Sequence, residues 1–384
     1  MSDVEKNIGT HKPQFDGEWV PISQVYDLQM GKTPSRDIPE YWNNGEHDWV
    51  SIKDLGSYEK YVGKTSETIS ELGRVKSGIK SVPANTLLMS FKLSLGKTAI
   101  TTKETYTNEA IMAFLDKGTY DVDIDYMWHQ LQSKDWTVGT NTAVMGKTLN
   151  KKTLSATKIR VPSISEQKEI AKHLDVVQET LSLLSLELKT LDDLVKSRFV
   201  EMFGDPKSNP HGWDIGTIET IAANLDAKRV PITQSDREEG PYPYYGATGA
   251  VDSVSGYIFD ERLLLVSEDG ANLLARTYPI AFSIFGKTWV NNHAHVLKVQ
   301  NEETQVFLEK LINMMDISEF ITGSTQPKLT QKQLNQIPVM LPPMSLQRQF
   351  AEFVARVDKL GFDVQQQIEK LETLKQSLMQ EYFG

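Results

Sequence analysis

A 51-residue segment occurs twice in this chain, and this repeat constrains the fold more than any other feature. Residues 154–204 align without a gap on residues 334–384, and 12 of the 51 aligned positions are identical. The identical pairs are Leu154/Leu334, Pro162/Pro342, Ser165/Ser345, Gln167/Gln347, Ala171/Ala351, Val177/Val357, Leu191/Leu371, Leu194/Leu374, Ser197/Ser377, Glu201/Glu381, Phe203/Phe383 and Gly204/Gly384. Unrelated amphipathic helices would share some leucines, but not the start signal, length and stop signal as well. The repeat is therefore an internal duplication.

Each copy of the repeat is predicted to form one long helix. A proline ends the strand before each copy, and Ser165 and Ser345 are the expected N-caps, because a serine hydroxyl can accept a backbone N–H of the first turn. Gly204 supplies a C-terminal stop. We therefore predict helices over 166–202 and 346–382, each about 55 Å long at about 1.5 Å per residue.

Apolar residues step by four and three along both predicted helices, which is the heptad pattern of a coiled coil. The predicted seam residues are Ile170, Leu174, Val177, Leu181, Leu184, Leu188, Leu191 and Val195, then Phe350, Val354, Val357, Val364, Ile368, Leu371 and Leu378. Gly361 and Lys375 weaken two seam positions. Because the second helix starts where the second globular segment ends, side-by-side pairing of the helices must be antiparallel, with a globular domain at each end and an approximate two-fold axis across the middle.

The chain accordingly divides into four parts: globular segments 1–150 and 205–330, and helical segments 151–204 and 331–384. The globular segments carry matching stretches in the same order, namely EWVPISQVY (18–26) with GWDIGTIETIA (212–222), LLMSF (87–91) with LLLVS (263–267), Gly-Lys-Thr at 96–98 and 286–288, TNEAIM (107–112) with NNHAHV (291–296), and IDYMWHQLQS (124–133) with VFLEKLINMM (306–315). Short strands followed by a late helix predict an α+β fold, with two small α/β domains joined by two long antiparallel coiled-coil helices.

Composition limits the classes of function. The chain has no cysteine, its first residues have no apolar core of a signal peptide, and no run of about 18 apolar residues suggests a membrane span, so we expect a cytoplasmic protein. The formal net charge of −10 argues against non-specific nucleic-acid binding. Residues 213–330 hold 9 Lys and Arg against 16 Asp and Glu, a net charge of −7, and residues 19–150 hold 14 against 16, a net charge of −2.

Motifs for catalysis are mostly missing from the sequence. Gly-Lys-Thr occurs five times, but a phosphate-binding loop needs a glycine five residues earlier, where the chain has Tyr26, Tyr58, Phe91, Asn141 and Ala281. His293 and His295 are either two ligands of a metal or surface strand residues. Glu268-Asp269-Gly270 is either a turn or an acidic group for cytosine N4 in the major groove. No catalytic residue and no metal site is predicted, so the chain is interpreted as a recognition protein.

The same order of motifs, present twice around duplicated helices, resembles the specificity subunits of Type I restriction-modification systems. The stretches that carry the resemblance are GKTPSR (31–36), YWNNGEHDWVSIKDL (41–55), PYYGATGAVD (243–252), LLLVSEDGANL (263–273), WVNNHAHVLK (289–298), GSTQPKL (323–329) and the two helix starts. The resemblance covers nearly the whole chain. It implies that the two globular segments are target recognition domains, each for one half of a split site in double-stranded DNA.

The resemblance also implies partners and an absence of catalysis in this chain. The helices would form a spacer that docks two modification (methyltransferase) subunits, and these would bring S-adenosylmethionine. In a complex that cleaves DNA, restriction motor-nuclease subunits would add ATP and Mg chemistry. This chain itself would need no cofactor and would not be an enzyme.

Candidate DNA contacts lie in polar loops, where Lys and Arg suit phosphate or guanine, and Asn and Gln suit adenine edges. They are Lys32, Thr33, Ser35, Arg36, Lys92 and Lys97 in the first segment and Tyr244, Tyr245, Lys287, Asn291, Asn292, Ser324, Thr325, Gln326 and Lys328 in the second. Leu183, Leu186 and Phe362 fall off the coiled-coil seam and are predicted to bind the partner.

Two readers on a helical spacer would fix the distance between two half-sites. A helix of about 55 Å corresponds to at most roughly 16 base pairs at 3.4 Å each. Because the two segments differ in sequence, the half-sites should differ. The alternatives are a coiled-coil scaffold whose end domains bind proteins, which the acidic charge favours, and a specificity module of a fused restriction-methylase system.

Overall fold

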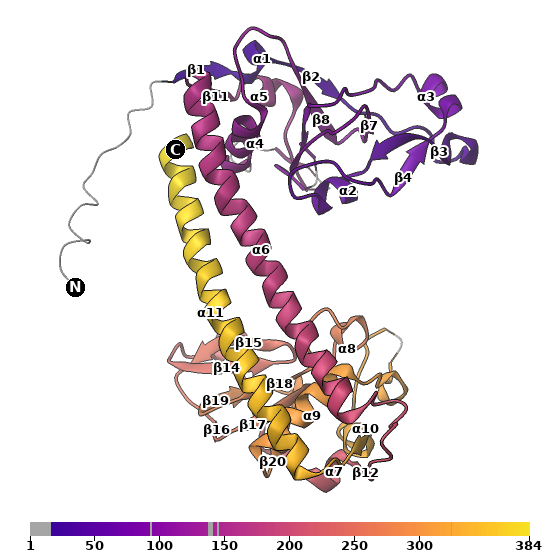
Figure 1. Ribbon diagram of the computed structural model, residues 1–384, viewed down its shortest axis with the longest axis vertical. Coiled ribbons are helices and arrows are strands. Elements are labelled where there is room, and N and C mark those ends of the chain that lie inside the picture. The colour runs from indigo at the N-terminus through magenta and orange to yellow at the C-terminus, as the bar shows by residue number, and fades with distance from the viewer. Residues whose placement is uncertain (1–16, 93, 137–140, 144–145, 324) are drawn as a thin grey trace, which may run out of the picture. The chain divides into compact units, whose positions relative to one another are not determined.

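The computed structural model describes residues 17–92, 94–136, 141–143, 146–323 and 325–384. The chain divides into two compact units, the first made of Met1–Leu183 with Ile368–Gly384 and the second of Leu184–Gln367. Helices α6 (Ile164–Phe203) and α11 (Met344–Phe383), each 40 residues long and uninterrupted in Figure 1, contribute to both units. Each helix is therefore three residues longer than the sequence predicts.

The first unit is an α+β domain. Before α6, its elements are β1 (Glu18–Pro21), α1 (Ile22–Val25), β2 (Tyr26–Met30), η1 (Pro39–Tyr41), β3 (Trp42–Val50), α2 (Ile52–Ser57), β4 (Glu67–Ile69), α3 (Glu71–Ser77), β5 (Leu87–Ser90), β6 (Thr98–Ile100), β7 (Tyr106–Thr107), β8 (Ile111–Asp116), α4 (Ile124–Ser133), β9 (Asn141–Ala143), β10 (Gly146–Thr148), α5 (Lys151–Ala156) and β11 (Lys158–Val161). The larger sheets have the orders β2-β8-β5-β6 and β4-β3-β7, and β1 pairs with β11 beside the start of α6.

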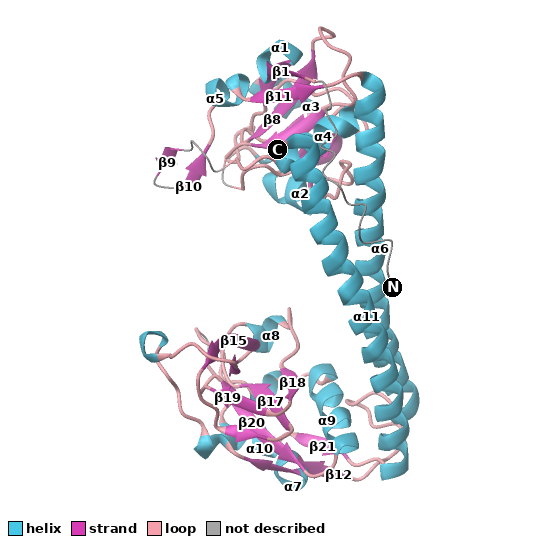
Figure 2. Cartoon of the chain, turned by 90° about the vertical axis from the view of Figure 1, so that its left-hand side faces the viewer, coloured by secondary structure: helices cyan, strands magenta, loops and turns pink. Residues whose placement is uncertain are grey.

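The second unit has the same kind of elements between α6 and α11. They are β12 (Ile215–Thr217), α7 (Ile218–Ile221), β13 (Ala222–Asn224), η2 (Asp226–Lys228), η3 (Gln234–Asp236), β14 (Tyr242–Gly246), β15 (Gly249–Val254), β16 (Phe259–Asp260), β17 (Leu263–Ser267), α8 (Asn272–Ala275), β18 (Ala281–Ile284), β19 (Lys287–Val290), β20 (Ala294–Val299), α9 (Glu302–Met314), η4 (Ser318–Phe320), α10 (Gln331–Gln336) and β21 (Pro338–Met340). Helix α9 lies beside the sheet that contains β17, β18 and β20 (Figure 2).

The two units share one topology. The sheet β2-β8-β5-β6 of the first corresponds to β13-β20-β17-β18 of the second. In the other sheet, the mixed set β4-β3-β7 corresponds to β15-β14-β19, and both contain one parallel pair, β3 with β7 and β14 with β19. Strands β1 and β12 likewise both pair with the strand that precedes a long helix. The predicted duplication therefore extends to the globular segments.

Strand registers correct two of the sequence matches. Ser90 lies opposite Ile111 and Ser267 opposite Ala294, so Leu87 and Leu88 do match Leu264 and Leu265, as predicted. The Gly-Lys-Thr at 96–98 leads into β6, whereas that at 286–288 leads into β19, the counterpart of β7; these two were matched wrongly. The TNEAIM and NNHAHV stretches match with a shift of one residue.

That shift follows from two asparagines in the same structural role. Asn108 donates its backbone N–H to Val50 O at 3.0 Å, and Asn291 donates to Tyr245 O at 3.0 Å. Each side chain then accepts a backbone N–H two residues later at 2.8 Å. Asn108 is therefore the counterpart of Asn291, one residue before Asn292.

The long helices start differently from the prediction. Ser163, not Ser165, caps α6: its hydroxyl accepts the Glu166 N–H at 3.4 Å, and the Glu166 carboxylate accepts the Ser163 N–H at 3.0 Å, as in a capping box. Ser345 lies inside the first turn of α11, so it is not an N-cap either. The repeated glutamines instead fasten both starts, because Gln167 donates to Pro162 O at 2.9 Å and Gln347 to Pro342 O at 2.8 Å.

Within each unit α6 and α11 pack antiparallel, as predicted. In the first unit His173 lies 3.3 Å from the Tyr382 hydroxyl, and five residues further along α6 Gln178 accepts from Lys375 at 2.6 Å. In the second unit the Phe203 and Phe350 rings are 5.3 Å apart, and a Cβ at Gly361 would lie 3.9 Å from Leu188 Cδ2. Residue numbers rise along one helix as they fall along the other.

The predicted seam is the apolar contact between the helices. Its most buried residues are Ile170, Leu174, Val177, Leu184, Val195, Phe350, Val354, Val357, Val364 and Ile368. At the start of α11 the seam merges with the core of the second unit through stacked and edge-on rings of Phe199, Phe203, Phe307 and Phe350. In the first unit Tyr126 and Phe383 make the corresponding contact, with ring centres 5.4 Å apart.

An ionic cluster also fastens α4 to α6 in the first unit. His129 Nε2 lies 2.7 Å from Asp175 Oδ1, and Lys60 Nζ lies 2.7 Å from both oxygens of the same carboxylate and 2.9 Å from Asp125. Burial lowers the pKa of His129, and the bond to Asp175 offsets only part of that effect. The α+β part of this unit is thus attached to the helix by charges as well as by apolar contact.

Candidate nucleic-acid interface

The candidate residues of the loop after β2 lie close together in the first unit. Lys32 donates to Ser77 O, and Thr33 donates to the Glu109 carboxylate while accepting from Asn108 Nδ2 at 3.1 Å. Ser35 is exposed, and the exposed Arg36 pairs with Glu67. The structure therefore presents this loop at the surface with most of its polar side chains already hydrogen-bonded within the protein.

Lys92 and Lys97 lie at the same end of the main sheet as this loop, between the end of β5 and the start of β6. Lys97 is exposed, and its backbone N–H donates to Ser90 Oγ at 3.0 Å. Lys92 is half-buried, with its ammonium 5.2 Å from the centre of the Phe91 ring. Both ammonium groups are available for phosphate contacts at the edge of the sheet.

Of the candidates in the second unit, Tyr244 and Asn291 are buried and Tyr245 is half-buried. Tyr244 is only 1% exposed, and its hydroxyl accepts the Ile232 N–H at 3.0 Å. Asn291 is buried, and its side chain accepts the His293 N–H. Tyr245 packs with Phe282 against an apolar cluster that includes Phe259 and Leu265. Their role is to shape the loops that surround them.

The other candidates of the second unit are exposed. Lys287 lies 4.8 Å from the centre of the Tyr257 ring, and Asn292, Thr325 and Gln326 face solvent. Lys328 is ion-paired with Glu268 at 3.2 Å. Ser324 lies outside the described residues.

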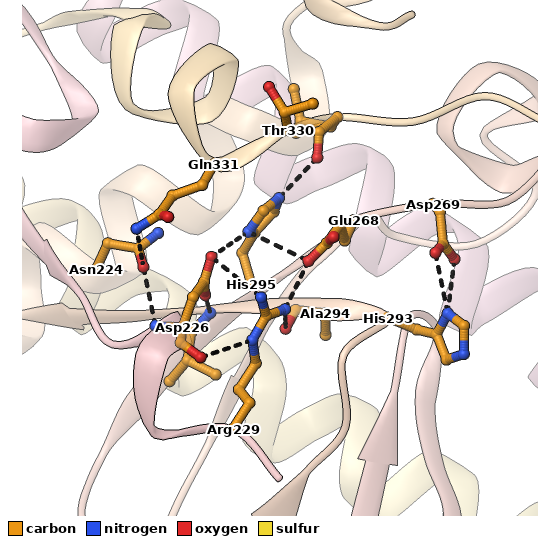
Figure 3. Close-up of polar contacts among 12 residues, drawn as sticks. Asn224, Asp226, Arg229, Glu268, Asp269, His293, Ala294, His295, Thr330 and Gln331 are labelled. Carbon is orange, nitrogen blue, oxygen red and sulfur yellow. Dashed lines mark hydrogen bonds and ion pairs between the residues drawn. The ribbon is translucent and has the colours of Figure 1, made fainter. Parts of the chain in front are cut away.

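Next to these loops, the second unit contains a buried ionic cluster of Asp226, Arg229, Glu268 and His295 (Figure 3). Arg229 Nη1 donates to Glu268 Oε2 at 2.6 Å and to Ala294 O at 2.7 Å, and Arg229 Nη2 lies 3.4 Å from Asp226. Asp226 also accepts the Val296 N–H at 2.8 Å. A single guanidinium thus connects η2, β17 and β20.

Both ring nitrogens of His295 are hydrogen-bonded in this arrangement. Nδ1 lies 2.6 Å from the Asp226 carboxylate and Nε2 lies 2.8 Å from Leu329 O. Burial alone would raise the pKa of Asp226, but the His295 hydrogen bond and charge and the Val296 N–H hold it below its usual range. The His295 ring therefore links the cluster to the backbone at Leu329, next to Lys328.

The cluster has the residue types of a metal site, but its geometry is that of an ion-pair network. The ligand atoms of Asp226, Glu268 and His295 lie within 4.8 Å of one another. Arg229 bonds to both carboxylates, and both ring nitrogens of His295 are already hydrogen-bonded, to Asp226 and to Leu329 O. His293 points elsewhere and pairs with Asp269 at 2.9 Å. Among the described residues, His293 and His295 therefore do not share a metal.

The alternatives for Glu268-Asp269-Gly270 are also decided by these contacts. Gly270, at a φ of +104°, donates to Pro327 O at 3.0 Å, and Glu268 O accepts the Leu329 N–H at 2.8 Å. Burial would raise the pKa of Glu268, but Arg229, His295 and Lys328 lower it, so its charge is used inside the protein. The stretch is a turn that holds the backbone at Pro327 and Leu329.

The predicted partner-binding residues Leu183, Leu186 and Phe362 are exposed on the long helices. Counting by the 180-residue repeat, their counterparts are Asp363, Gln366 and Ser182, so these three do not form two equivalent sites. Leu194 and Leu374, in contrast, are counterparts and are equally exposed, at 46% each. This identical pair lies off the seam, and identity between the two copies at an off-seam position is the sequence signal that could have marked it as a candidate.

In the part of the chain that the structure describes, no helix combines the length and apolar character needed to cross a membrane.

A family model for the Type I restriction modification DNA specificity domain matches this chain twice, over residues 16–191 and 210–373. The Type I restriction enzyme MjaIX specificity subunit of Methanocaldococcus jannaschii is 22% identical over 98% of this chain and 94% of its own length. The EcoprrI specificity subunit of Escherichia coli is 23% identical over 89% and 88%. A putative specificity subunit of Haemophilus influenzae is 34% identical, over 36% of this chain and 35% of its own.

Two solved structures share the fold. The S subunit of a Type I restriction-modification system from M. genitalium superposes with a TM-score of 0.59 and 16% identity, over 97% of each chain. A chain from a structure of complex assembly and conformational transition of the Type I R-M system gives a TM-score of 0.54 and 14% identity, over 96% of this chain and 97% of that one. At these identities the likeness establishes the fold alone.

Proposed function

The chain belongs to the family of Type I restriction-modification DNA specificity subunits, and we propose that its two related units read the two different halves of one bipartite DNA site. The recognition domains are assigned to 1–150 and 205–330, and the spacer helices to 151–204 and 331–384. DNA sequence recognition by two target domains is the function of this family. We propose in addition that each unit reads a different half-site and that partner subunits dock on the helices.

One observation carries the proposal: the chain contains the same topology twice, with different side chains at equivalent surface positions. Equal topology lets both units approach DNA in the same manner, and unequal side chains give each unit its own base preference. Two identical half-sites would need identical loops. The expected site is therefore asymmetric.

We further infer that two modification subunits dock on the helices, at equivalent places related by the 180-residue repeat. Leu194 and Leu374 support this docking, because an equally exposed leucine at equivalent positions suits two copies of one partner. The partners would hold S-adenosylmethionine and perform methyl transfer, and restriction subunits would use ATP and Mg. This chain would then act in the cytoplasm as the non-catalytic recognition subunit of the complex.

Charge supports a shared DNA interface. The second recognition domain has a net charge of −7 over residues 213–330, so its own surface offers little general attraction for phosphate. We therefore expect the isolated chain to bind DNA weakly and the assembled complex to bind it tightly, with partners making much of the phosphate contact.

Substitution of the paired leucines tests partner docking. Leu194→Glu should remove one modification subunit from the complex, and Leu194→Glu with Leu374→Glu should remove both, because each glutamate would be buried without a partner. Native mass spectrometry of the complex reports the number of bound subunits. Lys189→Glu, an exposed change on another face of α6, is the matched control and should retain both. Full assembly of the double variant would contradict this assignment of the docking sites.

A further inference from the structure

The loop after the first strand of the main sheet is fastened in the first unit by an arginine, aromatic rings and a carboxylate. The guanidinium carbon of Arg36 lies 3.7 Å from the centre of the Trp42 ring and 5.1 Å from that of Trp49. Arg36 also makes two hydrogen bonds to Glu67, the one from Nη2 to Oε2 being 3.0 Å long. The hydrogen bond to Glu67 raises the pKa of Arg36, so this contact is an ion pair.

The second unit repeats the arrangement with different residues. In the loop after β13, Arg237 lies with its guanidinium carbon 4.4 Å from the centre of the Tyr244 ring, and its Nη1 donates to Asp252 Oδ2 at 2.9 Å. The hydrogen bond from Arg237 lowers the pKa of Asp252. Sequence comparison of the two loops shows no match that would predict this recurrence.

Strand register shows that the two arrangements are equivalent. Trp49 of β3 lies opposite Glu67 of β4, and Tyr244 of β14 lies opposite Asp252 of β15. In both units the aromatic strand also pairs in parallel with its neighbour on the other side, β7 or β19. Trp49 therefore corresponds to Tyr244, and Glu67 corresponds to Asp252.

The equivalent aromatic residue also fixes the loop backbone upstream of the arginine. Trp49 Nε1 donates to Lys32 O at 3.1 Å, and the Tyr244 hydroxyl accepts the Ile232 N–H at 3.0 Å. Arg237 Nε adds a hydrogen bond to Ile232 O at 3.2 Å. We call the two sets of residues the arginine clamps. The first clamp consists of Arg36, Trp42, Trp49 and Glu67, and the second of Arg237, Tyr244 and Asp252.

Each clamp holds both ends of a short polar segment. In the first unit this segment is 33–35, with Ser35 exposed, and in the second it is 233–236, in which all four residues, Thr-Gln-Ser-Asp, are exposed. Thr233 Oγ1 donates to Asp236 at 2.6 Å, so the second segment has a defined turn. Such segments offer donors and acceptors in a fixed frame, which is what readout of base edges requires.

We propose that the two arginine clamps position segments 33–35 and 233–236 to read bases of the two half-sites, one segment in each unit. Arg36 and Arg237 are positioning residues in this scheme, and base contact comes from the segments between the fixed ends. The inference rests on the proposed reading of a bipartite site. It adds segment 233–236, which the candidate list from sequence omitted, as the counterpart of 33–35.

The chemistry of the clamp explains why arginine occupies it. A guanidinium can stack flat on a ring while its edge donates to a carboxylate in a planar fork, which an ammonium cannot do. Fixing both ends of a loop before DNA arrives removes part of the ordering cost of binding. A phosphate ligand would need its charge free, whereas Glu67 and Asp252 already neutralise these arginines.

The test uses the full chain assembled with its methyltransferase subunits. In the first unit the variants are Arg36→Gln, Arg36→Lys, Glu67→Gln and the Arg36→Gln/Glu67→Gln double variant; in the second they are Arg237→Gln, Asp252→Asn and their double variant. Arg74→Gln, which breaks an exposed ion pair with Glu71 on α3, is the matched control. Affinity is measured for the cognate duplex and for duplexes with a base change in either half-site, and circular dichroism confirms folding.

The clamp predicts that removing either partner lowers discrimination at its own half-site by about tenfold, the scale of discrimination that one base pair carries. Discrimination at the other half-site should be unchanged. Each double variant should lose no more discrimination than the corresponding single variant. Arg36→Lys should lose as much discrimination as Arg36→Gln. Arg74→Gln should behave as the unchanged chain.

Two outcomes would overturn the proposal. Unchanged discrimination in all clamp variants would show that the segments do not read DNA. Tighter binding of Glu67→Gln to every duplex, with uniformly weaker and less salt-dependent binding of Arg36→Gln, would make Arg36 a phosphate ligand instead. Failure of the proposed function is a separate result, because the unchanged complex would then show no dependence on two half-sites.

Discussion

The two units fill equivalent positions with opposite chemistry. At the end of the main sheet the first unit has Met30 opposite Met112, with Phe91 directly after the neighbouring strand; Met112 and Phe91 are buried, whereas Met30 is 51% exposed. Counting along β20 and β17 from the matched registers, the second unit has Asp226, His295 and Glu268 at these three positions, with Arg229 between the carboxylates. The backbone contact is the same in both: Leu149 N–H donates to Phe91 O, and Leu329 N–H donates to Glu268 O.

This difference teaches what a buried ionic cluster adds to a fold that does not need one. The first unit has no charged side chain at these three positions, of which Met112 and Phe91 are buried, and buried ion pairs are weak evidence for stability. The cluster of the second unit adds direction, because His295 is hydrogen-bonded to both Asp226 and Leu329. The backbone at Leu329 is therefore held in one orientation by hydrogen bonds, which apolar contacts alone would not impose.

The largest expected effect comes from removing the shared cation. Arg229→Ala leaves the buried Glu268 carboxylate without its main partner and removes a more distant cation from Asp226, and it should destabilise the second unit by about 3–5 kcal/mol. Denaturant unfolding, with hydrogen exchange of β17 and β20 peptides to locate the loss, measures this. The control is Arg262→Ala, which breaks a pair with the mostly exposed Glu302 and should cost about 0–1 kcal/mol. Equal costs for the two variants would contradict the account of the cluster.

Replacing the whole cluster should have a much smaller effect. A chain with Asp226→Met, Glu268→Phe, His295→Met and Arg229→Leu carries the apolar solution of the first unit and should retain stability to within about 2 kcal/mol, since no buried charge is left unpaired. Peptides covering 325–330 should nevertheless exchange faster, because His295 no longer holds Leu329. If the fourfold variant lost more stability than Arg229→Ala, the equivalence of the two sites would be wrong.

A smaller contrast is expected from pH. His129 of the first unit has a lowered pKa when folded, so the unfolded state binds the proton first and stability falls as pH drops below about 6.5. Asp175, Lys60 and Lys375 are the charged groups that face it. Asp226 and Glu268 of the second unit have lowered pKa values, so their contribution persists until pH falls below about 4.

Hydrogen exchange of peptides from α4 and β20, corrected for intrinsic rates, between about pH 7.5 and about pH 5 tests this contrast. Protection of α4 should fall over that interval while protection of β20 is retained. His129→Gln is the control and should remove the pH dependence of α4. A parallel loss in both units would mean that His129 is not its source.

Sequence alone predicted the features that depend on long periodic patterns. The 180-residue repeat and the heptads yielded two antiparallel helices and their seam, and the paired Leu-Leu strands predicted the duplicated sheets. Local signals were less reliable. Ser165 has the residue type preferred at an N-cap, but Ser163 forms the capping box with Glu166, two residues earlier in the chain.

The polar sites were beyond sequence reasoning because they depend on register between distant segments. Arg36 meets Glu67 across 31 residues and Arg229 meets Glu268 across 39, and nothing in the local spacing marks either pair. Tyr244 was chosen as a DNA contact from its polar surroundings. Alternation along a strand does not say which face is buried, and the register of β14 directs Tyr244 inward.

Methylation-site sequencing of cells that express this chain with its methyltransferase tests the central claim most directly. The comparison is between the unchanged chain and a chimaera in which residues 213–330 are exchanged for those of another family member. If each unit reads its own half-site, the unchanged chain should give an asymmetric split motif. In the chimaera, only one half of that motif should change. A change in both halves, or a motif that is not split, would contradict the account.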